Sequence, residues 1–149
     1  MSNQYPVWWD TTITIYNKYE DKLTRVVKWF SHTVSNCFWK YVGNKVTVAD
    51  VTINSEQVTC RIPKDASYVE PFQWLELTEE EKQSYFTIAP GDIIVKGEVT
   101  DEIDEYTQGY RSTDLIKKYK AMQGCMLVSR VAVDTGVGRC CEHYYVTGE

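Results

Sequence analysis

The chain has 149 residues, of which 43% are hydrophobic, 25% charged and 13% aromatic, and its formal net charge is −5. This length predicts one domain, and the composition is that of a globular chain that buries a core rather than of a disordered tail. Non-specific binding to nucleic acid needs an excess of lysine and arginine, so the acidic balance argues against it, and no apolar run approaches the roughly 20 residues of a membrane span.

The first ten residues, MSNQYPVWWD, lack a basic segment followed by an apolar stretch, so no secretory signal is predicted. The five cysteines follow no regular framework and are interpreted as free thiols in a reducing cytoplasm. We therefore expect a soluble protein that is made inside a cell, holds no cofactor and has no membrane partner.

The first half of the chain is expected to form short strands. Polar and apolar residues alternate in TTITIY, as they do in a half-buried strand. The segments predicted to be strands are 11–16, 23–30, 36–42, 46–53 and 57–62. The turns predicted between them are 17–22, Gly43-Asn44 and Asn54-Ser55. Pro63 is expected to end this run, because proline cannot donate to a sheet ladder.

The second half combines strands with two short helices. A loop is expected over Pro63–Leu77, and the capping-box pair Thr78 and Glu81 predicts a helix over TEEEKQSY. A second helix is predicted over Ser112–Met122, capped by Ser112 and stopped by Gly124. The remaining strands are predicted over 86–88, 92–99, 125–133 and 140–146.

This succession of about eight short strands predicts a mostly β fold, a small barrel or sandwich with two short helices. No repeat, low-complexity tract or linker divides the chain. Residues 1–149 are therefore expected to form a single domain, in which residues 1–10 are a candidate N-terminal arm.

The stretch APGDIIVKGEV (89–99) could belong to a phosphate or metal site, or to a strand preceded by a turn. It lacks the glycine spacing and the Lys-Ser/Thr ending of a P-loop. Pro90-Gly91 instead has turn chemistry, and Ile93-Ile94-Val95 is a continuous apolar run that suits a strand buried on both faces. Gly97 is expected to mark a bulge or a close backbone approach. We favour the structural interpretation.

Cys140, Cys141 and His143 form the best candidate metal site, with Cys37 and His32 as a possible second pair of ligands. A structural zinc site needs four ligands, usually in two closely spaced pairs, and this spacing matches no familiar pattern. Adjacent cysteines would also point to opposite faces of a strand. Two apolar thiols beside a surface histidine are the favoured interpretation, so no metal ligand is predicted.

No catalytic residue is predicted either. Neither histidine stands in a recognisable nucleophile–base motif. The carboxylates of DEIDE (101–105) resemble a cluster for magnesium or acid–base work, but nothing marks one of them as buried, so a solvated loop is favoured. Lys117, Lys118 and Lys120 are interpreted as a solvated or partner-facing surface of the second helix.

The order of motifs along the chain resembles a known family. TTITIYNKY, CFWK, RIP, YVEPFQW, FTIAPGDIIVKGEV and DEIDE are followed by a helix with LIKKYK and a closing strand with HYYVTG. This order resembles a family of small virion structural proteins encoded in tailed phages and prophages of Gram-positive bacteria. The resemblance covers essentially the whole chain, and FTIAPGDIIVKGEV with DEI is its most specific part.

A looser similarity extends to the head-closure (stopper) proteins of the siphophage neck, which are small β-barrels. This similarity implies a twelve-fold or six-fold ring of this chain in the virion, with adaptor and portal proteins above it and tail proteins below. Such a ring closes the channel on packaged DNA, which is only passing cargo, and docks the tail. A tail-terminator or tail-completion subunit is an alternative, and a small cytosolic metal-binding module using Cys140, Cys141 and His143 is another.

In a neck protein, aromatic side chains would anchor the contacts between subunits, and an acidic loop would let DNA slide through the channel. The candidate interface residues are Trp8, Trp9, Tyr68, Phe72 and Trp74. The candidate channel-facing residues are Asp101, Glu102, Asp104 and Glu105. Trp29 and Trp39, on predicted central strands, are expected to fill the core instead.

Overall fold

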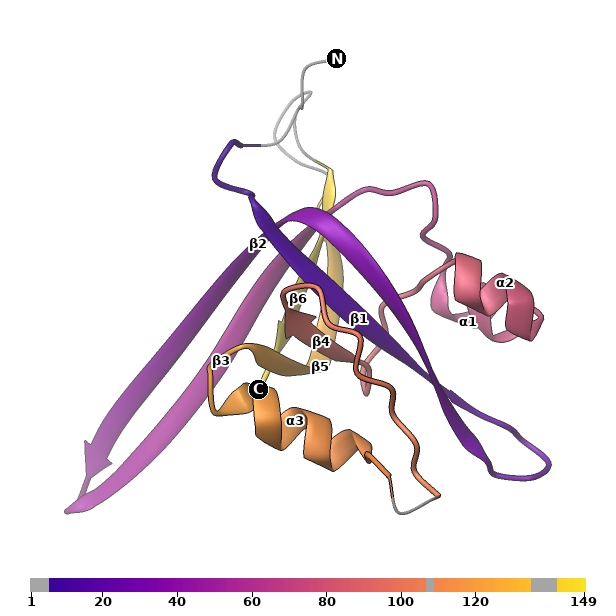
Figure 1. The fold of residues 1–149 in the computed structure, drawn as a ribbon. Coiled ribbons are helices and arrows are strands. Elements are labelled where there is room, and N and C mark those ends of the chain that lie inside the picture. The colour runs from indigo at the N-terminus through magenta and orange to yellow at the C-terminus, as the bar shows by residue number, and fades with distance from the viewer. Residues whose placement is uncertain (1–5, 107–108, 135–141) are drawn as a thin grey trace.

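The computed structural model describes residues 6–106, 109–134 and 142–149, without the side chains of 44–46, 53–56 and 134. In this part of the chain the strands close into a barrel with the order β1-β2-β3-β6-β5-β4, and every neighbouring pair is antiparallel (Figure 1). The strands are β1 (Thr11–Glu20), β2 (Val27–Val48), β3 (Val51–Pro63), β4 (Ile93–Lys96), β5 (Cys125–Asp134) and β6 (His143–Gly148). The predicted mostly β class and the barrel are confirmed.

Two long strands each take part in two portions of the barrel wall. Residues 27–37 of β2 pair with β1, whereas residues 38–48 pair with β3. The change of partner follows Asn36, whose φ of 60° bends the strand. Similarly, β5 pairs first with β4 over 125–127 and then with β6 over 128–134. Bends of this kind are what a short sheet needs in order to close on itself.

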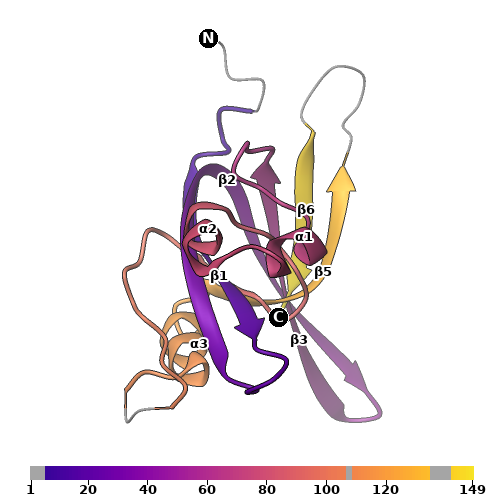
Figure 2. The same ribbon diagram turned by 90° about the vertical axis from the view of Figure 1, so that its right-hand side faces the viewer.

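The β2–β3 hairpin extends well beyond the barrel, as Figures 1 and 2 both show. Among the described residues, those of the outer hairpin pair only with each other, since β6 reaches β3 no further out than Val58. The chain reverses at Ala49 and Asp50, whose φ angles of 49° and 65° are those of a tight two-residue hairpin turn. The predicted turns at Gly43-Asn44 and Asn54-Ser55 are wrong, because all four residues are paired within the β2–β3 ladder, where Asn44 lies opposite Ser55. Only the pairing of the two strands decides where such a hairpin reverses.

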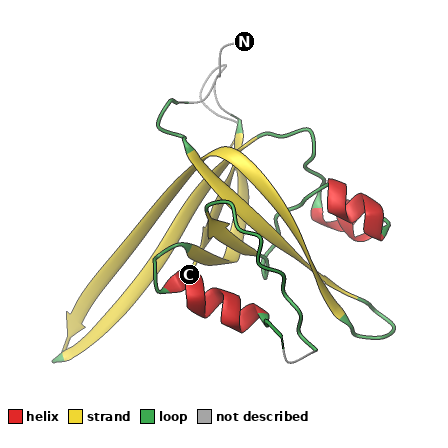
Figure 3. Cartoon of the chain, in the orientation of Figure 1, coloured by secondary structure: helices red, strands yellow, loops and turns green. Residues whose placement is uncertain are grey.

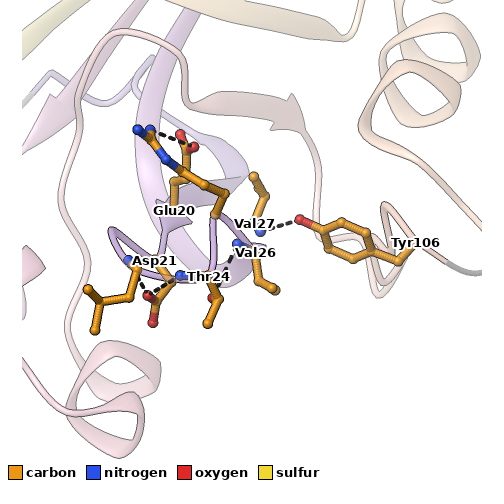
Figure 4. Close-up of polar contacts among 8 residues, drawn as sticks. Glu20, Asp21, Thr24, Val26, Val27 and Tyr106 are labelled. Carbon is orange, nitrogen blue, oxygen red and sulfur yellow. Dashed lines mark hydrogen bonds and ion pairs between the residues drawn. The ribbon is translucent and has the colours of Figure 1, made fainter.

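The first hairpin turn also lies later than predicted. β1 continues through 17–20, and the turn is formed by residues 21–26 (Figure 4). The Asp21 carboxylate accepts hydrogen bonds from the N–H groups of Leu23 and Thr24, at 2.8 and 3.1 Å. These bonds satisfy backbone donors that the turn leaves unpaired.

Three helices of the described chain lie outside the barrel wall: α1 (Pro71–Leu75), α2 (Glu79–Ser84) and α3 (Ser112–Lys120) (Figure 3). α1 interrupts the segment predicted to be a loop. The Lys82 ammonium of α2 donates to the carbonyls of Leu75, the last residue of α1, and of Leu77, which follows it. The predicted capping box of α2 is confirmed, since Thr78 and Glu81 bond to each other's backbone N–H. α3 begins as predicted, although Arg111 rather than Ser112 occupies the cap position. Residues 86–88 form a single bridge to Tyr68 and no strand.

Two clusters of apolar side chains form the core. The cluster inside the barrel consists of Ile13, Ile15, Val34, Cys37, Val58, Cys60, Ile62, Phe86, Ile88, Ile94, Met126, Val128, Tyr144 and Val146. The second cluster lies between the barrel wall and α3 and consists of Tyr16, Ile93, Val95, Leu115 and Cys125. The run Ile93–Val95 therefore packs on both faces, as predicted, because the barrel lies on one side of β4 and α3 on the other.

Candidate interaction surfaces

Asp92, in the segment that suggested a ligand site, is buried in a network of hydrogen bonds. Its Oδ2 accepts from Asn17 Nδ2 and from the Ala89 N–H, both at 2.9 Å, and its Oδ1 accepts from the Lys18 N–H at 3.0 Å. Asn17 in turn bonds to the backbone of Thr87 in both directions, at 2.6 and 3.3 Å. The network ties β1 to the turn that precedes β4.

Burial raises the pKa of Asp92 to about 6, although the hydrogen bonds from Lys18, Ala89 and Asn17 act in the opposite direction. These partners are all donors, so they fit the ionised carboxylate. Gly91 has a φ of 97°, which glycine adopts without strain, and it forms the turn that brings Asp92 into place. Within the described residues, the hydrogen bonds of the Asp92 carboxylate all come from the protein's own fold, which supports the structural interpretation.

The aromatic residues expected at a subunit interface fall into two groups. Trp8 and Phe72 are 64% and 67% exposed and remain available to a partner. Trp9 is buried against Phe38 and His143, with ring centroids 6.5 and 5.0 Å away. Trp9 thus holds the described part of the candidate arm, residues 6–10, against the barrel.

Trp74 and Tyr68 also pack within the chain. Trp74 is 1% exposed, its Nε1 donates to the Tyr85 carbonyl at 3.0 Å, and its ring meets Phe30 edge-on. Tyr68 is half-buried and stacks on Tyr144, with ring centroids 4.1 Å apart. The expectation of an interface role is therefore wrong for Trp9 and Trp74, because their rings fill the core of their own domain, and Tyr68 is largely used there too.

Trp29 and Trp39, expected in the core, are partly buried against the two apolar clusters. Trp29 packs on the cluster under α3, and its Nε1 donates to Glu105 Oε1 at 3.1 Å. Trp39 packs on the cluster inside the barrel. Both residues thus pack on the core, as predicted, although each is only partly buried.

The acidic segment 101–105 contains two different kinds of carboxylate. Asp101 accepts from the Tyr119 hydroxyl at 3.0 Å and from Lys118 Nζ at 3.1 Å, both on α3. Glu105 accepts from Trp29 Nε1 and from the Ser112 N–H that begins α3, both at 3.1 Å. These two carboxylates attach α3 to the barrel.

Burial alone would raise the pKa of Asp101, but hydrogen bonds from Tyr110, Lys118 and Tyr119 outweigh it and hold the pKa below its ordinary value. Glu102 and Asp104 are exposed, as in the solvated loop that the sequence favoured. Of the four residues expected to face a channel, these two present their side chains to the surface. Asp101 and Glu105 have a structural use instead, which is set by the position of α3.

The candidate metal ligands are not brought together in the described chain. Cys140 and Cys141 lie outside the described residues. His143 is buried rather than on the surface, which corrects the expectation, and its Nε2 lies 2.7 Å from Arg61 Nη1. Arginine only donates, so this Nε2 is an acceptor and is already engaged.

His32 and Cys37 do not act together either. His32 stacks on Phe86, whereas Cys37 lies beside Cys60 inside the barrel. Cys37, Cys60 and Cys125 are buried free thiols, as predicted, and burial raises the pKa of Cys125 to about 11. The described residues contain no group of three His, Cys, Asp or Glu side chains that could hold a metal ion.

A groove that the sequence did not reveal runs between β2, α2 and the acidic segment. It consists of two adjoining hollows of about 340 and 420 Å³. Both are lined by Trp29, Phe30, Gln83, Glu102 and Ile103. Within the chain order these residues are far apart, so no local pattern could have indicated the groove.

No helix in the described part of the chain is both long enough and apolar enough to span a membrane.

Comparison with known proteins places the chain in a family. No curated protein and no solved structure matches the sequence. A family model does match, over residues 8–149, and the chain therefore belongs to a family of unknown function (DUF6751).

Proposed function

We propose that this chain is a structural virion protein of the head–tail connector of a tailed phage, of the head-closure type. In this role it forms a ring that closes the DNA channel and docks the tail, with adaptor and portal proteins above and tail proteins below. The resemblance of its motifs to virion structural proteins, which extends over the whole chain, motivates the proposal. The structural observation that carries it is the projecting β2–β3 hairpin.

The β2–β3 hairpin is longer than the part of it that pairs with the rest of the described barrel. The strand from Val58, where β6 ends its pairing, to Val51 at the tip spans about 23 Å at the rise of an extended strand. At the tip, Val48 and Val51 are paired with each other and each is 60% exposed. An apolar element that projects this far suits the head-to-tail contacts of a ring, in which one part of a subunit meets a different part of its neighbour.

Exposed apolar side chains elsewhere provide surfaces for such a hairpin to contact. Val7 and Trp8 are 90% and 64% exposed beside the start of β1, and Phe72 and Leu75 are 67% and 47% exposed on α1. A few buried anchors, among which tryptophan is enriched, contribute most of the binding energy of typical interfaces, and Trp8 is available for this role. The exposed Glu102 and Asp104 suit a wall that repels the phosphates of passing DNA.

The experiment that tests this proposal is quantitative mass spectrometry of purified particles of the phage that encodes the chain. About one copy per portal subunit is expected for a closed ring at the neck. Hundreds of copies per particle would instead indicate a tail-tube or capsid protein, and absence from particles would refute a virion role.

The phenotype of a gene deletion separates the neighbouring assignments. Loss of a head-closure protein should give heads that leak DNA, whereas loss of a tail terminator should give tails of uncontrolled length. A measurement of bound metal on the purified protein tests the remaining alternative, since a metal-binding module should carry stoichiometric metal that is lost in His143→Ala.

A further inference from the structure

The first half of β2 is an open strand edge. Residues 27–37 have β1 on one side, but β3 pairs only with residues 38–48. In an antiparallel ladder, alternate residues direct their N–H and C=O groups to one side and then to the other. Lys18, which lies opposite Trp29, donates its N–H away from β2 to Asp92, so the backbone groups of Trp29 must point away from β1.

The same alternation applies along the whole edge. Val27, Trp29, Ser31 and Thr33 direct their backbone groups outward. The Val27 N–H is taken by the Tyr106 hydroxyl, which marks one end of the edge (Figure 4). The outward groups of Trp29, Ser31 and Thr33 have no hydrogen-bond partner within the described residues, and Ser31 and Thr33 are exposed. This edge is thus ready to pair with another strand.

The groove described above follows this edge. One of its hollows is lined by Trp29, Ser31 and the α2 residue Gln83, and the other continues past Val27 to Tyr106. Side chains of an added strand would point alternately to the two sides of the edge. Ile103 of the acidic segment also lines both hollows, so the groove offers apolar as well as polar contacts.

The charge of the groove limits what can occupy it. Its carboxylates are those of Glu79, Asp101, Glu102, Asp104 and Glu105. Lys28 is the one basic residue among the residues that line the two hollows, and it already contacts Glu79. A second copy of the same edge would bring two acidic segments together, and like charges across an interface oppose association. A segment bearing lysine or arginine has the complementary charge.

From this edge and its charge we propose that β2 binds an extended, basic segment of a partner protein, which adds as a strand along Trp29–Thr33. The backbone groups of Trp29, Ser31 and Thr33 supply the hydrogen bonds, and the exposed carboxylates of the groove, Glu102 and Asp104, select lysine or arginine side chains. This binding mode does not depend on the proposed place of the chain in a phage neck.

The test is a titration of the full chain with a short peptide of alternating lysine and valine, followed by NMR. Saturable binding is expected, with slower hydrogen exchange at the Ser31 and Thr33 amides and an affinity at least about tenfold above that of an alternating glutamate–valine peptide. Failure to reach saturable binding at millimolar peptide, or equal binding of both peptides, would overturn the proposal.

Two pairs of variants locate the binding. Ser31→Pro removes an outward N–H and leaves the ladder to β1 intact, so it should fold and lose binding, whereas Ser31→Ala should bind normally. Glu102→Lys should weaken binding of the basic peptide by about tenfold, and the exposed control Glu98→Lys should not. Unchanged binding by folded Ser31→Pro, or self-association of the chain that Ser31→Pro abolishes, would contradict the assignment of a basic partner to this edge.

Discussion

Gly148, at the end of β6, lies where only a hydrogen atom fits. It pairs with Val58 of β3 on one side and with Val128 of β5 on the other. An ideal Cβ at this position would lie 2.1 Å from the Leu127 carbonyl oxygen and 2.6 Å from Met126 Cγ. The obstacle is the backbone of β5 at the point where that strand changes partner. The substitution Gly148→Ala therefore forces the two strands apart.

The expected cost follows from these contacts. Overpacking a close-packed site costs about 1–3 kcal/mol. Separation of the strands would also weaken the two backbone hydrogen bonds between Leu127 and Glu149, at 2.9 and 3.3 Å, each worth about 1 kcal/mol. A total of about 3–5 kcal/mol corresponds to a fall in Tm of about 10 °C for a domain of this size.

Thermal unfolding followed by circular dichroism measures this effect, with Gly43→Ala as the matched control. A Cβ on Gly43 would be 3.5 Å from the Tyr41 ring, an ordinary contact, so its Tm should change by no more than about 2 °C. If Gly148→Ala also unfolds within about 2 °C of the parent protein, the close approach of β5 and β6 is not a constraint and the reasoning is refuted.

Three further predictions follow from the Asp92 network, the hairpin tip and the edge of β2. Because the pKa of folded Asp92 is raised to about 6, the folded state binds a proton that the unfolded state has released, and the free energy of unfolding should fall by up to about 3 kcal/mol as pH rises from about 4 to about 6; urea unfolding across this range should show a flatter profile for Asp92→Asn, and an unchanged slope would contradict the assignment. Val48→Asp combined with Val51→Asp should leave Tm within about 2 °C, since both side chains are exposed, but should reduce incorporation of the chain into particles; normal incorporation would separate the hairpin from assembly. Tyr106→Phe should speed hydrogen exchange at the Val27 amide at a cost of about 1 kcal/mol or less, and an unchanged exchange rate would show that this hydroxyl does not protect the edge.

The sequence did not indicate which of the aromatic residues expected at an interface are exposed and which are buried. Trp8 and Trp9 are neighbours in the sequence, yet one is 64% exposed and the other is buried against Phe38 and His143. Nothing in MSNQYPVWWD distinguishes them, because burial depends on which distant strand lies beneath each ring. The same reason explains the buried positions of Trp74 and His143.

The features that could be predicted from the sequence are local ones. Alternation and β-branched runs specified the mostly β class, the pair Thr78 and Glu81 specified the start of α2, and the continuous apolar run Ile93–Val95 specified a strand covered on both faces. Each of these signals depends on residues only a few positions apart, so it can be recognised without knowing how the rest of the chain folds.

The features on which the functional proposals depend are tertiary and could not be predicted in this way. The length of the β2–β3 hairpin, the unpaired edge at Trp29–Thr33 and the attachment of α3 through Asp101 and Glu105 all arise from contacts between segments far apart in the chain. A strand edge is open only when no other strand lies beside it, and a carboxylate is a structural tie only when a distant donor reaches it. Neither condition can be read from neighbouring residues, because closure of the barrel determines which segments meet.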